Sequence, residues 1–310
     1  MINIRNVSRH FEDTLALENV SLEIPAGQVV GLLGQNGAGK TTLLRIITGS
    51  LMPSSGSVTI GAQHHPAPTV QAKARIGYLP ENCPLYEDML VHEYLTSIAA
   101  LRGLPRKGRI KAAQQVAEEL GLSRYFHQPI HTLSKGYKQR VGLAQALIHD
   151  PEIVILDEPT SGLDPGQMIE IQHVIQRLGE SKTVLLSTHN LNEVEGCCDR
   201  IVIMVNGTLA LDRTLGDLVH LPHTDISIQA GAQNVQETLT GIEGVTKVTQ
   251  ISSENGHMRW RLHHAKSISV GRRIIALAQT NHWLIDAVQP GRTTLADVFH
   301  ETHSARAETQ

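Results

Sequence analysis

Apolar and polar residues alternate along the first 28 positions of the chain. INIRNV at 2–7 and VSLEI at 20–24 place an apolar side chain at roughly every second position. A period of two is typical of β-strands with one buried face. The chain is therefore expected to open with a small antiparallel sheet.

Continuous apolar runs mark a second kind of strand. VVGLLG at 29–34 is followed by a glycine-rich turn and by the helical pattern KTTLLRIITG at 40–49. Two further runs, EIVILD at 152–157 and TVLLST at 183–188, are separated by a helical segment. This rhythm predicts βαβ units and a buried parallel sheet, so the fold class is α/β.

Helical periodicity dominates from about 85 to 150. VHEYLTSIAALRG, RIKAAQQVAEELG and SKGYKQRVGLAQALIHD repeat apolar residues at helical spacing, and a glycine ends each of the first two segments. We expect a helical insert, or helical subdomain, within the α/β domain.

The pattern restarts after His220. Strand, helix, strand, strand, helix and strand can be assigned between TDISIQA at 224–230 and WLIDAVQ at 283–289. That order suits a small α+β domain of the ferredoxin-like type. We therefore expect two domains, 1–220 and 221–310.

Charge and composition exclude several classes of protein. The chain has 310 residues with a formal net charge of −3, whereas a nucleic-acid-binding domain usually carries a basic excess. The three cysteines suit neither a disulfide framework nor a CxxC metal site. The chain shows neither an apolar run of about 18 residues nor a secretory signal at its start, which predicts a cytoplasmic protein.

A phosphate-binding loop follows the strand at 29–34. The residues 34–41, GQNGAGKT, fit G-x-x-x-x-G-K-[ST] between a strand and a helix, where backbone N–H groups can cradle phosphates. Lys40 would reach the β- and γ-phosphates, and the Thr41 hydroxyl would bind Mg²⁺. The alternative is a chance glycine turn. The residues expected to contact the phosphates are Gly34, Asn36, Gly37, Ala38, Gly39, Lys40, Thr41 and Thr42.

Two adjacent carboxylates follow the apolar strand at 153–156. Ligands bind at the carboxyl ends of strands in open α/β sheets, which is where Asp157 and Glu158 stand. Asp157 would hold Mg²⁺ through water, and Glu158 would accept a proton from the attacking water. Helix capping is the alternative role for these acidic residues.

A third motif indicates which family of nucleotide-binding proteins the chain resembles. LSKGYKQR at 133–140 resembles the LSGGQ signature of ABC proteins, with Lys135 and Tyr137 as departures. SGLD at 161–164 resembles the D-loop, and His189 resembles the switch histidine. These motifs occur in the family's order within residues 1–215. The chain therefore resembles the ATP-binding subunits of ABC transporters.

The resemblance implies a head-to-tail dimer, either of two identical chains or with a related ATPase. Each ATP would lie between the P-loop of one chain and the signature of the other, where Ser134 and the backbone at Gly136 reach the γ-phosphate and Asp164 belongs to the D-loop. Phe11 would stack on adenine. Glu81, where the family usually has glutamine, would bind Mg²⁺ or orient water, or would be an ordinary surface side chain.

The subgroup is suggested by three segments. YLPE at 78–81, the variant signature and TLADVF at 294–299 resemble the ATPases of ABC-2 exporters, including the gliding-motility group. This implies ABC-2 permease subunits as membrane-spanning partners, a location at the cytoplasmic face of the membrane, and an unidentified, exported substrate.

Two other functions remain as alternatives. A soluble ABC protein could clamp nucleic acid, but such proteins usually have two cassettes or a long coiled coil, and this chain has neither and lacks a basic tract. A module that holds ATP without turnover is disfavoured by Glu158 and His189. We therefore expect an ATPase with ATP and Mg²⁺ as its ligands and with no nucleic-acid partner.

Overall fold

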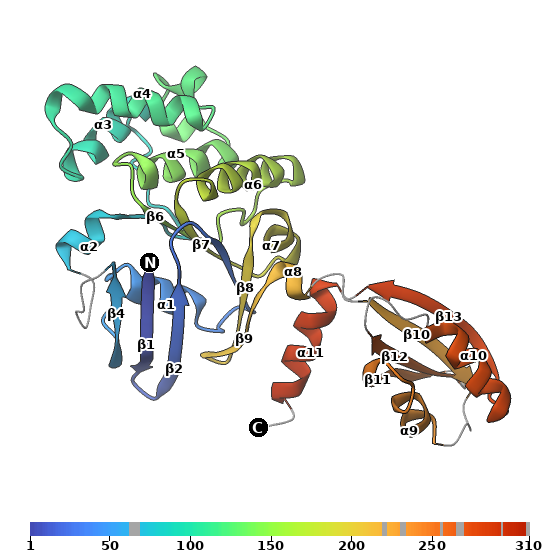
Figure 1. Ribbon diagram of the computed structural model, residues 1–310. Coiled ribbons are helices and arrows are strands. Elements are labelled where there is room, and N and C mark those ends of the chain that lie inside the picture. The colour runs from blue at the N-terminus through green and yellow to red at the C-terminus, as the bar shows by residue number, and fades with distance from the viewer. Residues whose placement is uncertain are drawn as a thin grey trace. The chain divides into compact units, whose positions relative to one another are not determined.

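A computed structural model describes residues 1–61, 69–218, 222–229, 234–254, 257–264, 270–292 and 294–307. The chain divides into two compact units, Met1–Arg213 and Thr214–Gln310, which are described separately (Figure 1). The predicted boundary between 220 and 221 falls at 219–221, outside the described residues. Among the described helices, none is long and apolar enough to cross a lipid bilayer.

The first unit opens with the predicted antiparallel sheet. It has the order β2-β1-β4, and β1 pairs antiparallel with both neighbours. Its strands are β1 (Ile2–Phe11), β2 (Thr14–Ile24) and β4 (Ser55–Ile60). The inward side chains of this sheet are buried, which confirms the period-two pattern as the signal of one buried face.

The core of the first unit is a six-stranded sheet of order β5-β6-β7-β3-β8-β9. The pairs β5–β6, β6–β7, β7–β3 and β3–β8 are parallel, as the apolar runs predicted. Its strands are β3 (Val29–Leu33), β5 (Ile76–Leu79), β6 (Ile153–Asp157), β7 (Thr183–Thr188), β8 (Arg200–Val205) and β9 (Thr208–Thr214). Asn206 and Gly207, both with positive φ, form the two-residue turn of the β8–β9 hairpin.

Helices cover both faces of this sheet. Helix α1 packs between the two sheets through its leucine and isoleucine side chains, and the insert helices pack with α6 against the opposite face. The helices are α1 (Lys40–Ile47), α2 (Val70–Ala74), α3 (Val91–Leu101), α4 (Arg109–Glu119), α5 (Lys135–Leu147), α6 (Pro165–Gly179) and α7 (Leu191–Cys197).

The second unit is an α+β sandwich. Its antiparallel sheet has the order β11-β12-β10-β13, the ferredoxin-like arrangement that the order of elements predicted. Helices α9 and α10 pack on one face. The elements are α8 (Leu215–Leu218), β10 (Pro222–Gln229), α9 (Val235–Thr240), β11 (Val245–Glu254), β12 (His257–His264), α10 (Val270–Thr280), β13 (Ile285–Arg292) and α11 (Leu295–Ala307).

The topology of the core sheet places three loops together. Strands β6, β7 and β3 are neighbours, so Asp157 lies opposite Ser187, and Leu33 lies opposite Thr188. The loops that leave the carboxyl ends of these strands consequently meet at one edge of the sheet.

Candidate active site

A cavity of about 470 Å³ lies where these loops meet. It collects most of the predicted phosphate-binding residues together with Glu81, Glu158 and His189. Its lining residues are Ala16, Gln35, Asn36, Gly37, Ala38, Gly39, Lys40, Thr41, Thr42, Glu81, Glu158, Ser161 and His189.

The glycine-rich loop owes its shape to two left-handed residues. Gly37 has φ 83° and Gly39 has φ 100°. A Cβ on Gly39 would lie 2.8 Å from the carbonyl oxygen of Ala16, so glycine is required there on steric grounds as well. Gly39 is the N-cap of α1, whose free N–H groups begin at the cavity.

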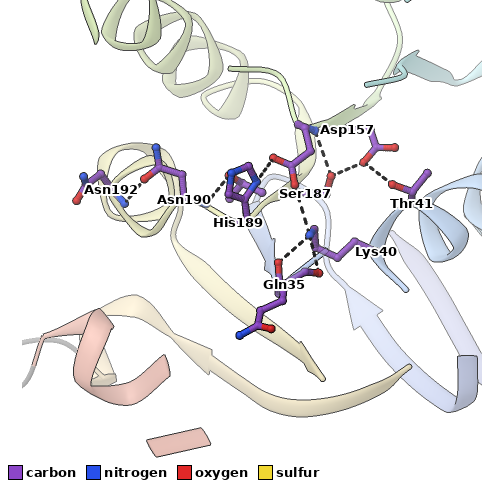
Figure 2. A network of polar contacts seen from close by, with 11 residues as sticks. Gln35, Lys40, Thr41, Asp157, Ser187, His189, Asn190 and Asn192 are labelled. Carbon is purple, nitrogen blue, oxygen red and sulfur yellow. Dashed lines mark hydrogen bonds and ion pairs between the residues drawn. The ribbon is translucent and has the colours of Figure 1, made fainter. Parts of the chain in front are cut away.

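Lys40 is buried below the loop. Its ammonium donates hydrogen bonds to the carbonyl oxygens of Gly34 at 2.7 Å and Gln35 at 3.3 Å. It also lies 3.4 Å from Glu158 Oε1, and both side chains are less than a tenth exposed. Figure 2 shows the contact between Lys40 and Gln35. The charge of this lysine is thus held at the floor of the cavity by two carbonyls and one carboxylate.

Glu158 stands between Lys40 and His189. Its second oxygen, Oε2, lies 2.8 Å from His189 Nδ1, and its backbone N–H donates to Ser187 Oγ at 3.2 Å. The residue has φ 50°, an uncommon conformation for a side chain other than glycine. This backbone turns the side chain of Glu158 into the cavity, whereas Asp157 remains within the sheet.

Asp157 is buried beside two hydroxyl groups. Ser187 Oγ donates to Asp157 Oδ1 at 2.5 Å, and Thr41 Oγ1 donates to the same oxygen at 3.2 Å. Oδ2 is buried with no hydrogen-bond partner among the described residues. A free carboxylate oxygen next to a hydroxyl is the ligand chemistry that Mg²⁺ prefers, so these residues fit the ion. Glu81 lines the same cavity.

A second glutamate lies close by but is not a candidate base. Glu193 in α7 is fully buried, and burial raises the pKa of its carboxyl group to about 7. It is absent from the cavity lining, whereas the Glu158 carboxylate faces the cavity. Its position away from the cavity therefore excludes Glu193 as the base.

Six predicted residues are absent from the cavity lining of the single chain. Two of them, Gly34 and Asp157, contact the lining residues Lys40 and Thr41. The other four lie elsewhere. Phe11 is 42% exposed at the end of β1, with the Arg9 guanidinium 4.5 Å from the centre of its ring. Ser134 is the exposed N-cap of α5 and makes no side-chain capping bond. Gly136 is buried, and Asp164 accepts a hydrogen bond from Gln167 N–H as the N-cap of α6. The structure does not bring these four residues to the cavity.

The two departures from the common signature have local contacts. Tyr137 packs against Tyr125 of the insert, with ring centres 4.2 Å apart and the rings tilted by 48°. The Lys135 side chain crosses the position that a Cβ would occupy on Gly162. Neither contact involves Ser134, so the hydroxyl group of the signature serine stays open to solvent.

Some residues of the site were not predicted from the sequence. Ala16 and Gln35 line the cavity. Ser187 Oγ donates to the carboxylate of Asp157 and accepts from the backbone N–H of Glu158. Ser187 follows the apolar run of β7 as Asp157 follows that of β6. A polar residue at the end of a buried parallel strand is the sequence signal that would have indicated Ser187.

Comparison with known proteins decides the family. Residues 17–161 match the family model described as ABC transporter. The chain is 30% identical to the linearmycin resistance ATP-binding protein LnrL of Bacillus subtilis, over 96% of this chain and 97% of that protein. It is 37% identical to the uncharacterized ABC transporter ATP-binding protein YdbJ of the same organism, over 69% and 70%. The chain belongs to the ABC transporter ATP-binding proteins.

A solved structure supports the fold and the nucleotide. The ATP-binding cassette MJ0796, a dimer in a post-hydrolysis state bound to ADP and Pi, aligns with a TM-score of 0.63 and 27% identity. The alignment covers 69% of this chain and 99% of that one. This ABC protein is accordingly an ATPase: it binds and hydrolyses ATP as the energy-supplying subunit of a transporter.

Proposed function

We propose that Glu158 is the general base that activates water for ATP hydrolysis. The observation that carries this assignment is its carboxylate in the cavity, 2.8 Å from His189 Nδ1 and 3.4 Å from Lys40 Nζ. A carboxylate at this position can accept the proton of a water that attacks the terminal phosphate. His189, held against the base, would orient that water or the phosphate.

Lys40 and the loop backbone would bind the phosphates. The ammonium can exchange its contacts with Gly34 and Gln35 for phosphate oxygens without leaving the cavity floor, because all of these groups lie in the same loop. Thr41 and Asp157 would hold Mg²⁺, with Glu81 at the same cavity. When bound, the ion neutralises charge on the phosphate oxygens.

We further propose that a second ATPase chain, identical or related, completes the site. Ser134, Gly136 and Asp164 lie outside the cavity of their own chain, although they belong to motifs that resemble nucleotide-binding ones. The free Ser134 hydroxyl at the N-terminus of a 13-residue helix suits a phosphate from a facing chain. The dimeric form of MJ0796 supports this arrangement, in which Phe11 would contact adenine.

Replacing Ser134 with arginine should block the closed dimer, because a long cationic side chain would fill the space that the facing phosphate needs. We expect ATP hydrolysis to fall about 100-fold or more while the single chain still binds ATP, in line with the loss of a group that stabilises developing charge. Ser123→Arg, on an exposed serine of the insert, is the matched control. Steady-state hydrolysis and equilibrium ATP binding are the measurements, and unchanged hydrolysis in Ser134→Arg would count against the shared site.

The partners are proposed to be membrane-spanning permease subunits of the ABC-2 type, on whose cytoplasmic side the ATPase pair would act in export. The similarity to LnrL, a linearmycin resistance ATP-binding protein, supports export, because export of a compound is one physical route to resistance. Purification of this chain from a membrane fraction should recover a multi-span protein. Recovery of ribosomes or DNA instead would favour the nucleic-acid alternative.

The unit after residue 213 is proposed to be an accessory domain, within the predicted range 221–310. Every residue that lines the nucleotide cavity precedes it in the chain.

A further inference from the structure

The accessory unit has one apolar and one polar sheet face. Ile226 and Ile228 of β10, with Trp260 and Leu262 of β12, pack under helices α9 and α10. Residues at the alternate positions of these two strands therefore point to the other face, which carries polar and charged side chains. Asp225, Ser227, His257, Arg259 and Arg261 lie in its middle part, and the remaining alternate positions are His223, Gln229 and His263.

A hollow of about 390 Å³ lies on this polar face. Its floor follows the strand register: Arg259 pairs with Ser227 on one side and with Ser252 on the other, and Ser227 pairs with Ala287. Three of these four side chains are small, and they leave room around Arg259. A hollow of this size holds a small organic molecule.

One ion pair and one histidine–carboxylate contact form the sides of the hollow. Arg261 contacts both oxygens of Asp225 at 2.8 and 2.9 Å and also reaches Asp297 at the start of α11. These hydrogen bonds raise the pKa of Arg261 and so keep it charged. On the other side, His257 Nδ1 lies 2.7 Å from Asp286. Each carboxylate in the lining therefore already has a hydrogen-bonding partner.

Arg259 differs from these paired groups. Among the residues that the structure describes, it has no hydrogen-bond or ion-pair partner, and the same holds for the hydroxyl groups of Ser227 and Ser252 beside it. The groups left free at the floor are thus a guanidinium and two hydroxyls. Together they form a donor set for an oxyanion.

We propose that this hollow binds a small carboxylate anion. The planar guanidinium of Arg259 matches a carboxylate through two parallel hydrogen bonds, and the serine hydroxyls can donate to the same group. Arg259 supplies one positive charge that contacts no carboxylate among the described residues, which suits a monoanion. A phosphate dianion would bring a second negative charge towards Asp225 and Asp286, so the charge balance favours a carboxylate.

The test uses the full-length protein with three monoanionic probes, pyruvate, lactate and glutamate, and with inorganic phosphate in a separate titration. Isothermal titration calorimetry should show saturable binding of at least one carboxylate at one site per chain, tighter than that of phosphate. Arg259→Met should weaken this binding about 10- to 100-fold, as expected for the loss of charge-assisted hydrogen bonds. Arg272→Met, on an exposed arginine of α10, is the control and should bind as the wild type does.

A second variant tests the place of binding. Ser227→Leu fills the floor while keeping every charge, and it should abolish binding of the carboxylate; circular dichroism verifies that the variant is folded. If none of the three probes binds, or if Arg259→Met binds them as tightly as Arg272→Met, the proposal is wrong. If phosphate binds more tightly than the carboxylates, the assignment to a carboxylate is overturned. ATP hydrolysis by the same preparation is read independently, so failure here is distinct from failure of the nucleotide site.

Discussion

Replacing Glu158 with glutamine is expected to reduce ATP turnover about 10²- to 10⁴-fold, the usual contribution of a general base. The amide keeps the size of the side chain but cannot accept the proton of the attacking water. ATP affinity should be retained or increased, because the phosphate contacts of Lys40 and the loop remain and the carboxylate that now holds Lys40 loses its charge. Single-turnover hydrolysis and equilibrium ATP binding are the two measurements.

Glu152→Gln is the matched control for this prediction. Glu152 immediately precedes Ile153, the first residue of β6, and so lies at the end of the strand away from Glu158. Its side chain is exposed and pairs with Arg75. Its loss should leave turnover near the wild-type value, since a surface ion pair contributes little to stability. Equal turnover in Glu158→Gln and Glu152→Gln would remove Glu158 from the mechanism.

Replacing Lys40 with alanine is expected to act on binding itself. The variant loses a charged donor to the phosphates, and ATP affinity should fall about 10- to 100-fold, which corresponds to roughly 1.4–2.8 kcal/mol. Turnover should fall as well, because the same ammonium would stabilise charge on the transferred phosphate. Titration with a fluorescent ATP analogue measures the affinity.

Lys111→Ala, on an exposed lysine of α4, controls for the loss of one surface charge. It should bind ATP as the wild type does. An unchanged affinity in Lys40→Ala would mean that the ammonium keeps its contacts with Gly34 and Gln35 when ATP is bound, and the assignment of the P-loop lysine would be wrong.

The core strands and the residues of the phosphate-binding loop could be predicted from the sequence because local patterns agree with the fold. A glycine-rich turn follows one apolar run, and two carboxylates follow another. These two signals together predicted the nucleotide site. The support from Ser187 was not predicted, because it depends on which strands are neighbours: β6 and β7 pair, and 30 residues separate Asp157 from Ser187. Pairing between distant strands is a tertiary property.

The hairpin of β8 and β9 was not among the predicted elements, although Asn206 and Gly207 between apolar runs are a strong turn signal. Through this hairpin the core sheet extends to Thr214. The two compact units of the chain meet between Arg213 and Thr214. The positive φ of Glu158 was also inaccessible, because nothing in its residue type requires that conformation.

The mass of the Glu158→Gln variant in solution tests the central claim, that two ATPase chains enclose the nucleotide, most directly. Sedimentation equilibrium with ATP and Mg²⁺ should give a dimer, with twice the mass of one chain, because ATP that is not hydrolysed holds the two chains closed. Without nucleotide, or with Ser134→Arg added, the same variant should sediment as a single chain. A single-chain mass for Glu158→Gln at saturating ATP would contradict the account for two identical chains.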